Sequence, residues 1–252
     1  DMADNRVNYK VNYDEISRVY DQVRGVDRAV IESFLNGVAL DASCTLLDIG
    51  CGTGNYTDVM QQLTQAHITG LDQSEGMLAK ARAKNDQLDF GQGDAQQMPF
   101  ASASFDFIYM TDVIHHVPDI GRLLGEIARV LKLGGKVCIV TQSHAQIARR
   151  PIATFFPSTV AVDTARYPDI PQIVAAAAAH GLALVREERL GEGEPTLYGQ
   201  PFLAAVRTRG YSMLRLISDE EYTRGLAQVE AQLAQGDLTV NKAGKTLIWL
   251  QR

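Results

Sequence analysis

Residues 46–55 read LLDIGCGTGN, in which an apolar segment leads directly into a glycine-rich turn. Leu46, Leu47 and Ile49 predict a buried β-strand over 45–49, and residues 56–63 predict a helix that follows the turn. Glycine at positions 50 and 52 lets the backbone bend sharply and approach a ligand closely. The free N–H groups of the following helix would then lie near that ligand. The sequence therefore predicts a nucleotide-like ligand at the end of the first strand.

The spacing of the glycines distinguishes between nucleotide ligands. A dinucleotide-binding turn has the pattern G-x-G-x-x-G, whereas here the third glycine is Gly54 and position 55 is Asn55. Asp48 precedes the turn, and a carboxylate there disfavours a pyrophosphate but suits a cationic ligand such as S-adenosylmethionine. We expect Asp48 to act on the ammonium group of this ligand, directly or through water. The alternative is that Asp48 only fixes the turn through backbone hydrogen bonds.

Two more acidic residues follow the next two expected strands. Asp72 comes directly after the strand at 67–71 and could accept hydrogen bonds from both ribose hydroxyls. It could instead cap the helix that begins near Ser74. Met77, one turn later, could pack on the adenine ring.

Asp94 follows the third expected strand, at 88–91. Its carboxylate could accept from the adenine amino group while the Ala95 N–H binds a ring nitrogen. A single aspartate in a turn is common and proves little. Acids after three successive strands, however, form a consistent binding pattern for an adenosine group.

The remaining pattern of the first half is that of alternating strands and helices. Further strands are expected at 105–110 and 136–141, and helices at 74–84 and 120–131, the last capped by Gly134-Gly135. This order predicts an α/β fold with a parallel sheet and right-handed connections. Ligands bind such sheets beyond the carboxyl ends of the strands.

The second half is less regular. Pro151, Pro157, Pro168 and Pro171 suggest a loop-rich region. The remaining expected elements are helices at 172–180 and from Ser218 to about 235, strands at 182–190 and 246–250, and a loop at 191–199. If the last two strands pair, the residues between them form an insertion, and insertions of that size are often functional.

Five segments together resemble the motifs of class I S-adenosylmethionine-dependent methyltransferases, in particular the small-molecule enzymes of the ubiquinone- and menaquinone-biosynthesis type. The segments are Leu46–Gly54, Leu71–Leu78, Gly93–Phe100, Phe105–Val117 and Leu131–Val140. The resemblance covers about residues 40–145. It implies a Rossmann-like, mostly parallel seven-stranded sheet with helices on both faces. The residues and the resemblance together give the expected cofactor-binding residues: Asp48, Gly50, Cys51, Gly52, Asp72, Gln73, Met77, Asp94, Ala95 and Thr111.

The pattern of expected elements also suggests a division of the chain into four parts. Residues 1–40 would form an N-terminal helical lid, and 41–190 the S-adenosylmethionine-binding core. Residues 191–244 would form a helical insertion that caps the substrate, and 245–252 the final strand of the core sheet. A helix is expected over 13–24, where Tyr20 is a candidate catalytic residue of the lid and Tyr13 a candidate substrate contact.

Methyl transfer is an in-line displacement at the sulfonium carbon, so the protein must align the acceptor and exclude water. Residues 111–116, after the fourth strand, should lie beside the methyl group. His116 is a candidate general base there, or a group that orients the substrate; His115 is a weaker candidate, and either histidine could be structural. His144, after the fifth strand, could contact the substrate or lie exposed in a loop. We expect no metal, because neighbouring histidines seldom bind one ion and no carboxylates cluster around them.

The amino-acid composition and net charge of the chain limit which classes of binding partner are expected. The chain has 252 residues and a formal net charge of −6, which disfavours nucleic acid as a partner. Residues 1–10 are polar and nothing approaches a membrane span, so we expect no secretion signal, no membrane partner and a cytoplasmic protein. Cys44, Cys51 and Cys138 match no zinc pattern and are expected as buried or half-buried thiols.

The function expected from the sequence is methyl transfer from S-adenosylmethionine to an oxygen, nitrogen or carbon atom of a small metabolite, by a monomer or homodimer. An NAD-dependent oxidoreductase conflicts with the glycine spacing and with Asp48. A nucleic-acid (RNA) methyltransferase remains an alternative, although residues 111–114 lack the Asn/Asp-Pro-Pro-aromatic motif of amino methylation. A non-catalytic S-adenosylmethionine-binding protein is the third possibility, and turnover of an acceptor would exclude it.

Overall fold

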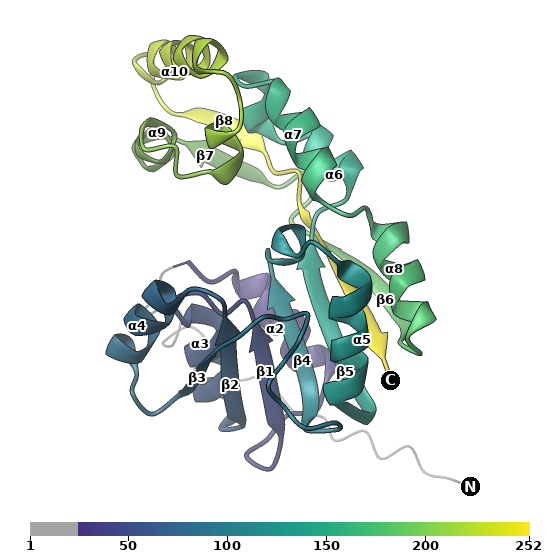
Figure 1. Cartoon of the computed structure of the whole chain (residues 1–252). Coiled ribbons are helices and arrows are strands. Elements are labelled where there is room, and N and C mark those ends of the chain that lie inside the picture. Colours follow the sequence, from purple (N-terminus) through teal and green to yellow (C-terminus); the bar gives the residue numbers. More distant parts are fainter. Residues whose placement is uncertain (1–24) are drawn as a thin grey trace, which may run out of the picture. The chain divides into compact units, whose positions relative to one another are not determined.

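The computed structural model describes residues 25–252, which form one large sheet, a two-stranded sheet and surrounding helices (Figure 1). The strands are β1 (Thr45–Ile49), β2 (His67–Asp72), β3 (Asp89–Gln92), β4 (Phe105–Thr111), β5 (Leu131–Thr141), β6 (Ala183–Leu190), β7 (Pro195–Tyr198), β8 (Leu238–Asn241) and β9 (Lys245–Gln251). The α-helices are α2 (Arg28–Gly37), α3 (Asn55–Thr64), α4 (Glu75–Lys84), α5 (Ile120–Val130), α6 (His144–Ala148), α7 (Ser158–Arg166), α8 (Ile170–Ala179), α9 (Gln200–Arg207) and α10 (Asp219–Leu233). Short 3₁₀ helices are η1 (Ile114–His116), η2 (Pro151–Thr154) and η3 (Ser212–Arg215).

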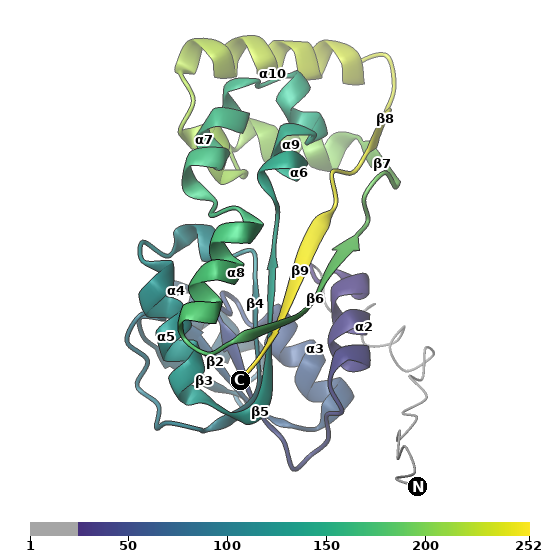
Figure 2. The ribbon, with the colours of Figure 1, turned by 90° about the vertical axis from the view of Figure 1, so that its right-hand side faces the viewer.

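The large sheet has seven strands in the order β3-β2-β1-β4-β5-β9-β6. Strand β1 pairs in parallel with β2 on one side and with β4 on the other, and β2–β3 and β4–β5 are also parallel. Helices α2 and α3 lie on one side of this sheet and α5 on the other (Figure 2). The expected Rossmann-like α/β fold, mostly parallel and with helices on both faces, is confirmed.

The strand order places a topological switch point between β1 and β4. The chain extends from β1 outward to β2 and β3, then returns to the other side of β1 to form β4. At such a point the connections after two adjacent strands leave in opposite directions, which opens a crevice at their carboxyl ends. The turn after β1 and the segment after β4 therefore lie at the edge where open α/β sheets bind ligands.

Buried aromatic side chains hold helix α2, which precedes β1, against strands β4 and β9. The central ring cluster contains Phe34 of α2, Phe107 and Tyr109 of β4, and Trp249 of β9, all fully buried. The rings of Phe107 and Trp249 stack at 5.7 Å, and those of Phe34 and Tyr109 lie 5.0 Å apart. This rigid core fixes the strand ends that carry the candidate site, because interiors packed at this density resist displacement.

The chain divides into two compact units. The first unit contains the residues up to Val140 together with Val174–Arg186 and Ile248–Arg252; the second contains Thr141–Ile173 and Glu187–Leu247. The second unit has its own apolar core, built around Phe155, Phe156 and Phe202. The expected domain bounds stay a prediction, but the compact units divide the chain elsewhere, because residues 141–173 group with 187–247.

The expected helix cap at Gly134-Gly135 is wrong. Helix α5 ends at Val130, and Leu131 already has an extended backbone, with its N–H donating to the Ile127 carbonyl. The two glycines lie inside β5, where the pairing with β4 shifts register between Phe105 and Phe107. Gly134 has φ +78°, so glycine is required by an irregularity within the strand rather than by a helix end.

The expected loop-rich region around the four prolines is largely helical. Pro151 is the first residue of η2, Pro157 directly precedes α7, and Pro171 is the second residue of α8. Proline is tolerated in the first turn of a helix because its missing N–H would have no partner there. In this region proline therefore marks helix starts rather than loops.

The expected loop at 191–199 contains strand β7, which pairs antiparallel with β8. Neither short strand has an apolar run, since the side chains alternate between exposed and half-buried. The last two strands of the large sheet do pair, because β9 lies beside β6. The helix expected from Ser218 is capped by that residue, since the Ser218 hydroxyl accepts from the Glu221 N–H at the start of α10.

Candidate functional site

The turn after β1 is held against β2 by its own backbone. The N–H groups of Gly50 and Cys51 both donate to the Leu71 carbonyl, at 2.7 and 3.1 Å. Gly50, Gly52 and Gly54 all have positive φ, between +54° and +77°. A Cβ at Gly50 would lie 2.4 Å from Val113 Cγ2, so glycine here lets the segment after β4 approach the turn.

Gly52 and Gly54 face different surroundings. A Cβ added at Gly52 would meet no atom within 4 Å, so that side of the turn is open. A Cβ added at Gly54 would lie 2.8 Å from Phe90 Cζ, so the third glycine packs tightly on β3. The turn therefore presents an open front at Gly52 and a closed back at Gly54.

Asp72, the last residue of β2, joins this open front to the next helix. Its Oδ2 accepts from the Gly52 N–H and its Oδ1 from the Ser74 N–H, both at 2.8 Å. Ser74 in turn caps α4 by accepting from the Met77 N–H. Each carboxylate oxygen has two lone pairs, so Asp72, which is half-buried, keeps one acceptor site on each oxygen for a ligand. The alternative that Asp72 itself caps α4 is wrong, because Ser74 is the N-cap; at this helix Asp72 only accepts from the Ser74 N–H.

Asp48 lies inside the protein rather than on the open front. Its side chain is buried, and Oδ2 accepts from the Thr57 hydroxyl of α3 at 2.7 Å. Its Oδ1 and the Tyr109 hydroxyl are both buried without a hydrogen bond of good geometry, yet the two groups interact electrostatically. Burial raises the pKa of Asp48 to about 7, against the opposing effect of Thr57 and Tyr109. Burial also raises the pKa of Tyr109 well above its usual value.

The surroundings of Asp48 supply little that would stabilise the negative charge of its carboxylate. An ionised carboxylate without a cation in an apolar interior is costly, which is why its pKa rises. A cation bound near the turn would offset that cost. The buried, under-bonded Oδ1 is therefore the feature of this turn that best fits a cationic ligand.

Asp94 follows β3 and is exposed. Its Oδ1 accepts from the Gln96 N–H at 2.8 Å, and the Gln96 side-chain amide lies 3.2 Å from the same atom. The Gln96 backbone bond is the main cause that lowers the pKa of Asp94, followed by the side-chain amides of Gln96 and Gln73. Asp94 is thus an ionised, outward-facing acceptor, as a contact to an amino group requires.

The other residues expected to bind the cofactor differ in how far their side chains are exposed to solvent. Gln73 and Met77 are exposed at the start of α4, whereas Ala95 is buried. Cys51 is buried, and a Cβ at Gly70 would lie 2.8 Å from its sulfur, so the thiol packs on β2. Burial raises the pKa of the Cys51 thiol, so it is a neutral packing group. Cys44 is half-buried and Cys138 is buried, as expected, and none of the three cysteines forms a disulfide within residues 25–252.

The segment after β4 turns sharply at Asp112. Asp112 has φ +56° and donates its N–H to the Val140 carbonyl at 3.0 Å. The 3₁₀ helix η1 then brings His115 and His116 together, with ring centroids 4.0 Å apart. His116 is exposed and Thr111 is half-buried at the strand end. His116 is therefore accessible from solvent, as a general base would have to be.

His144 belongs to the second unit, at the start of α6. Its backbone N–H donates to Asp169 Oδ1 at 3.0 Å, and its Nε2 lies 2.8 Å from the Tyr167 carbonyl. These contacts fix the ring against the segment before α8, so His144 is not a loose loop residue. Tyr13 and Tyr20, and the helix expected over 13–24, lie outside the described residues.

Sequence reasoning missed several residues that shape this site. Thr57 bonds to Asp48, Val113 packs on Gly50, and Lys84 bonds to Thr53 and Asn55. No local pattern identifies such partners, because each contact joins residues that are distant in the sequence. The alternation of strands and helices places their elements side by side but does not specify which side chains meet.

The first unit has the features that an adenosine-bearing cation requires. The turn offers open space at Gly52, an acceptor at Asp72 and an exposed carboxylate at Asp94. The buried Asp48 carboxylate would be stabilised by a nearby positive charge. These residues come from the ends of β1, β2 and β3, which are neighbours in the sheet.

Residues 47–139 match the family model described as "Methyltransferase domain". This segment is a methyltransferase domain. It contains the turn, Asp72, Asp94 and the segment after β4, so the expected resemblance to class I S-adenosylmethionine methyltransferases is confirmed.

Curated relatives match this domain rather than the whole chain. The biotin biosynthesis bifunctional protein BioHC of Cellvibrio japonicus is 40% identical over 133 residues, which is 52% of this chain and 26% of that protein. The demethylmenaquinone methyltransferase of Lactococcus lactis subsp. lactis is 39% identical over 107 residues, which is 40% of this chain and 42% of that protein. The chain thus spans less than half the length of these relatives.

Solved structures extend the likeness to most of the fold. A protein of an antibiotic biosynthesis pathway from Anabaena variabilis has a TM-score of 0.72, with 19% identity over 91% of this chain and 99% of that one. The geranyl diphosphate C-methyltransferase of Streptomyces coelicolor A3(2), in complex with Mg²⁺, geranyl diphosphate and S-adenosylhomocysteine, has a TM-score of 0.59. Its identity is 16% over 89% of this chain and 78% of that one. At these identities the likeness concerns the fold alone. Within residues 25–252, no helix combines the length and apolarity needed to span a bilayer.

Proposed function

We propose that this chain binds S-adenosylmethionine at the ends of β1–β3 and transfers its methyl group to a small-molecule acceptor beside the end of β4. The observation that carries the proposal is the open front of the turn at Gly52, bordered by the Asp72 carboxylate that accepts from the Gly52 N–H. The methyltransferase domain match over residues 47–139 and the small-molecule methyltransferases among the relatives support it.

Different residues of the first unit would contact different parts of S-adenosylmethionine. Asp72, with one acceptor site left on each oxygen, would accept from the ribose hydroxyls. Asp94, kept ionised by Gln96, would accept from the adenine amino group, with Ala95 supplying its backbone N–H. Asp48 would stabilise the ammonium from below the turn, through water, because its carboxylate is buried. Gln73, Met77 and Thr111 would complete the contacts around the adenosine.

S-adenosylmethionine, when bound, supplies an activated methyl group with its own leaving group. The chain then has to orient the acceptor, exclude water and, for an acceptor that carries a proton, accept that proton. His116 is the candidate for the last role, since it is exposed in η1 directly after β4. Tyr13, Tyr20 and His144 remain proposals for the acceptor side of the site.

Calorimetry with the full chain tests the cofactor. S-adenosylmethionine and S-adenosylhomocysteine should bind with dissociation constants on the order of micromolar, whereas NADH should not bind. Binding of NADH without binding of the methyl donor would refute the proposal. Incubation with an isotopically labelled methyl donor and a metabolite pool, followed by mass spectrometry of labelled products, would then identify the acceptor; labelled RNA would instead favour the nucleic-acid alternative.

A further inference from the structure

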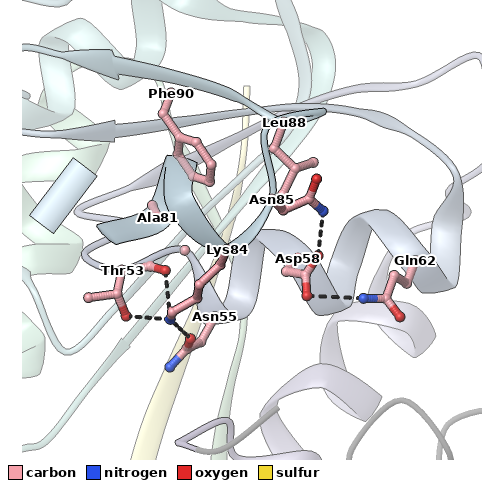
Figure 3. Close-up of a pocket in the computed structure, with 10 residues that line it drawn as sticks. Thr53, Asn55, Asp58, Gln62, Ala81, Lys84, Asn85, Leu88 and Phe90 are labelled. Carbon is pink, nitrogen blue, oxygen red and sulfur yellow. Dashed lines mark hydrogen bonds between the residues drawn. The ribbon is translucent and has the colours of Figure 1, made fainter. Parts of the chain in front are cut away.

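A pocket lies behind the glycine turn. It has a volume of about 640 Å³ and is lined by Thr53 and Gly54 of the turn together with residues of α3, of α4 and the segment after it, and of β3 (Figure 3). Asp48, Asp72 and Asp94 do not line it, so this rear pocket is separate from the proposed cofactor contacts. Its polar lining side chains are turned toward one another, and Lys84 lies at its edge next to the turn (Figure 3).

The Lys84 ammonium makes three hydrogen bonds to residues in and beside the turn. It donates to the Thr53 carbonyl and the Thr53 hydroxyl, each at 3.0 Å, and to Asn55 Oδ1 at 2.6 Å. An ammonium has three N–H donors, so these contacts use all of them. Thr53 stands between Gly52 and Gly54 and is 31 positions away from Lys84 in the sequence.

The turn is therefore held from two opposite sides. In front, the Gly52 N–H donates to Asp72, which would also bind the cofactor. Behind, Gly54 packs on Phe90, and Lys84 holds the carbonyl between the two glycines. A carbonyl held this way fixes the peptide plane that follows Thr53 and limits how far Gly52 can move.

This arrangement matters because three glycines in five residues make the turn intrinsically mobile. Ordering the backbone of one residue costs about 1–2 kcal/mol, and glycine loses the most freedom. A turn that is ordered before the ligand arrives does not incur this cost on binding. The cation on α4 thus pre-organises a turn whose sequence alone would leave it flexible.

We propose that Lys84 is a positioning residue for the cofactor turn, acting through Thr53 and Asn55 without touching the cofactor. The inference rests on the proposed function for its effect on affinity, but the ordering of the turn can be measured without any ligand. Lys84 is exposed at the end of its helix, so its loss should leave the packed core of the first unit unchanged. Because solvent competes with exposed charged contacts, the expected effect is moderate.

The experiment compares Lys84→Met with Lys84→Arg and with the control Lys80→Met. Lys80 lies on the same helix, is exposed and carries the same charge, so Lys80→Met reproduces the change in net charge. The measurements are the calorimetric dissociation constant of S-adenosylhomocysteine, the thermal midpoint, and hydrogen exchange of the amides of residues 51–55 without ligand. We expect Lys84→Met to weaken binding roughly three- to tenfold and to speed exchange in residues 51–55.

The controls separate positioning from general destabilisation. The thermal midpoint of Lys84→Met should match that of Lys80→Met, and Lys84→Arg, which keeps a charged donor, should recover part of the affinity. Equal binding by Lys84→Met and the unaltered chain would overturn the inference, as would equal weakening by both methionine variants. Faster exchange throughout the first unit, rather than at the turn, would also overturn it. If the unaltered chain fails to bind S-adenosylhomocysteine, the proposed function fails, and the exchange comparison still decides whether Lys84 orders the turn.

Discussion

Asp72 in the first unit and Asp163 in the second both tie separate elements together, but they do so in opposite ways. Asp72 is half-buried and accepts one backbone N–H on each oxygen. Asp163 is fully buried and binds two arginines: Arg150 through Oδ2, and Arg166 through Oδ1. The Arg166 side chain also reaches the Ser212 hydroxyl at 3.1 Å, which joins α7 to η3.

This difference in hydrogen-bond donors and burial distinguishes a carboxylate that can bind a ligand from one that is structural. Asp163 receives charged donors on both oxygens and has 1% exposure, so nothing further can reach it. Asp72 receives only neutral backbone donors and keeps an accessible side. A carboxylate that organises a turn while retaining acceptor capacity is therefore the better candidate for ligand contact, and the remaining predictions test this distinction.

The largest effect is expected for Asp163→Asn, which should lower the free energy of unfolding of the second unit by about 3–5 kcal/mol. The change leaves Arg150 and Arg166, 14% and 22% exposed, without the charge that compensates them. Denaturant unfolding followed by far-ultraviolet circular dichroism measures the loss. Glu230→Gln is the matched control, since Glu230 pairs with Arg207 on the surface and should cost less than about 1 kcal/mol.

The same experiment separates the two units. Trp249, the single tryptophan, is buried in the first unit and reports on it by fluorescence. If the units unfold independently, Asp163→Asn should shift the dichroism transition to lower denaturant while the fluorescence transition stays in place. Equal costs for Asp163→Asn and Glu230→Gln would contradict the structural role assigned to Asp163.

Asp72→Ala should show the opposite behaviour, with a large effect on binding and a small one on stability. Losing the two ribose acceptors should weaken S-adenosylhomocysteine binding by roughly 100-fold or more, because each of the two bonds contributes about 1.5–3 kcal/mol. The Gly52 and Ser74 N–H groups that it leaves lie near solvent and can bind water. Calorimetry measures the affinity, and Asp86→Ala, an exposed acid in the turn after α4, is the control for charge. Unchanged affinity would remove Asp72 from the ribose role.

The sequence predicted the elements whose signals are local. Residues 45–49 form a mostly apolar segment of strand length, and the acids at 48, 72 and 94 stand at or near the ends of successive strands in the structure as well. Parallel strands bring their carboxyl ends to one edge, so the proposed cofactor contacts could be assembled from the order of the elements alone. The cap at Ser218 could be predicted because a cap bonds within three residues, whereas for α4 the sequence offered Asp72 in place of the true cap, Ser74.

The sequence could not predict features that depend on distant partners. Gly134 looks like a helix cap until the register shift of β5 against β4 is known. Strands β7 and β8 stabilise each other across about forty residues and carry no apolar run. The contacts of Lys84 with Thr53 and of Asp163 with its arginines arise only once helices pack side by side.

Asp48 sharpens the comparison through pH, because burial raises its pKa to about 7 from an ordinary value near 3.8. The folded chain therefore binds the Asp48 proton more tightly than the unfolded chain between these values. Its contribution to stability is full below pH 3.8 and is lost as the pH rises toward 7, by at most about 1.4 kcal/mol per pH unit. Asp48→Asn should remove this trend, so denaturant unfolding at several pH values between 4 and 8 should show the two chains diverging as the pH rises. If Asp48 also stabilises the ammonium of the cofactor, the affinity of the unaltered chain for the cofactor should decrease as the pH is lowered below 7, because the carboxylate becomes protonated. The affinity of Asp48→Asn should be lower at pH 7 and above and should not show this pH dependence. A flat pH dependence of both stability and affinity in the unaltered chain would assign Asp48 to the Thr57 contact alone.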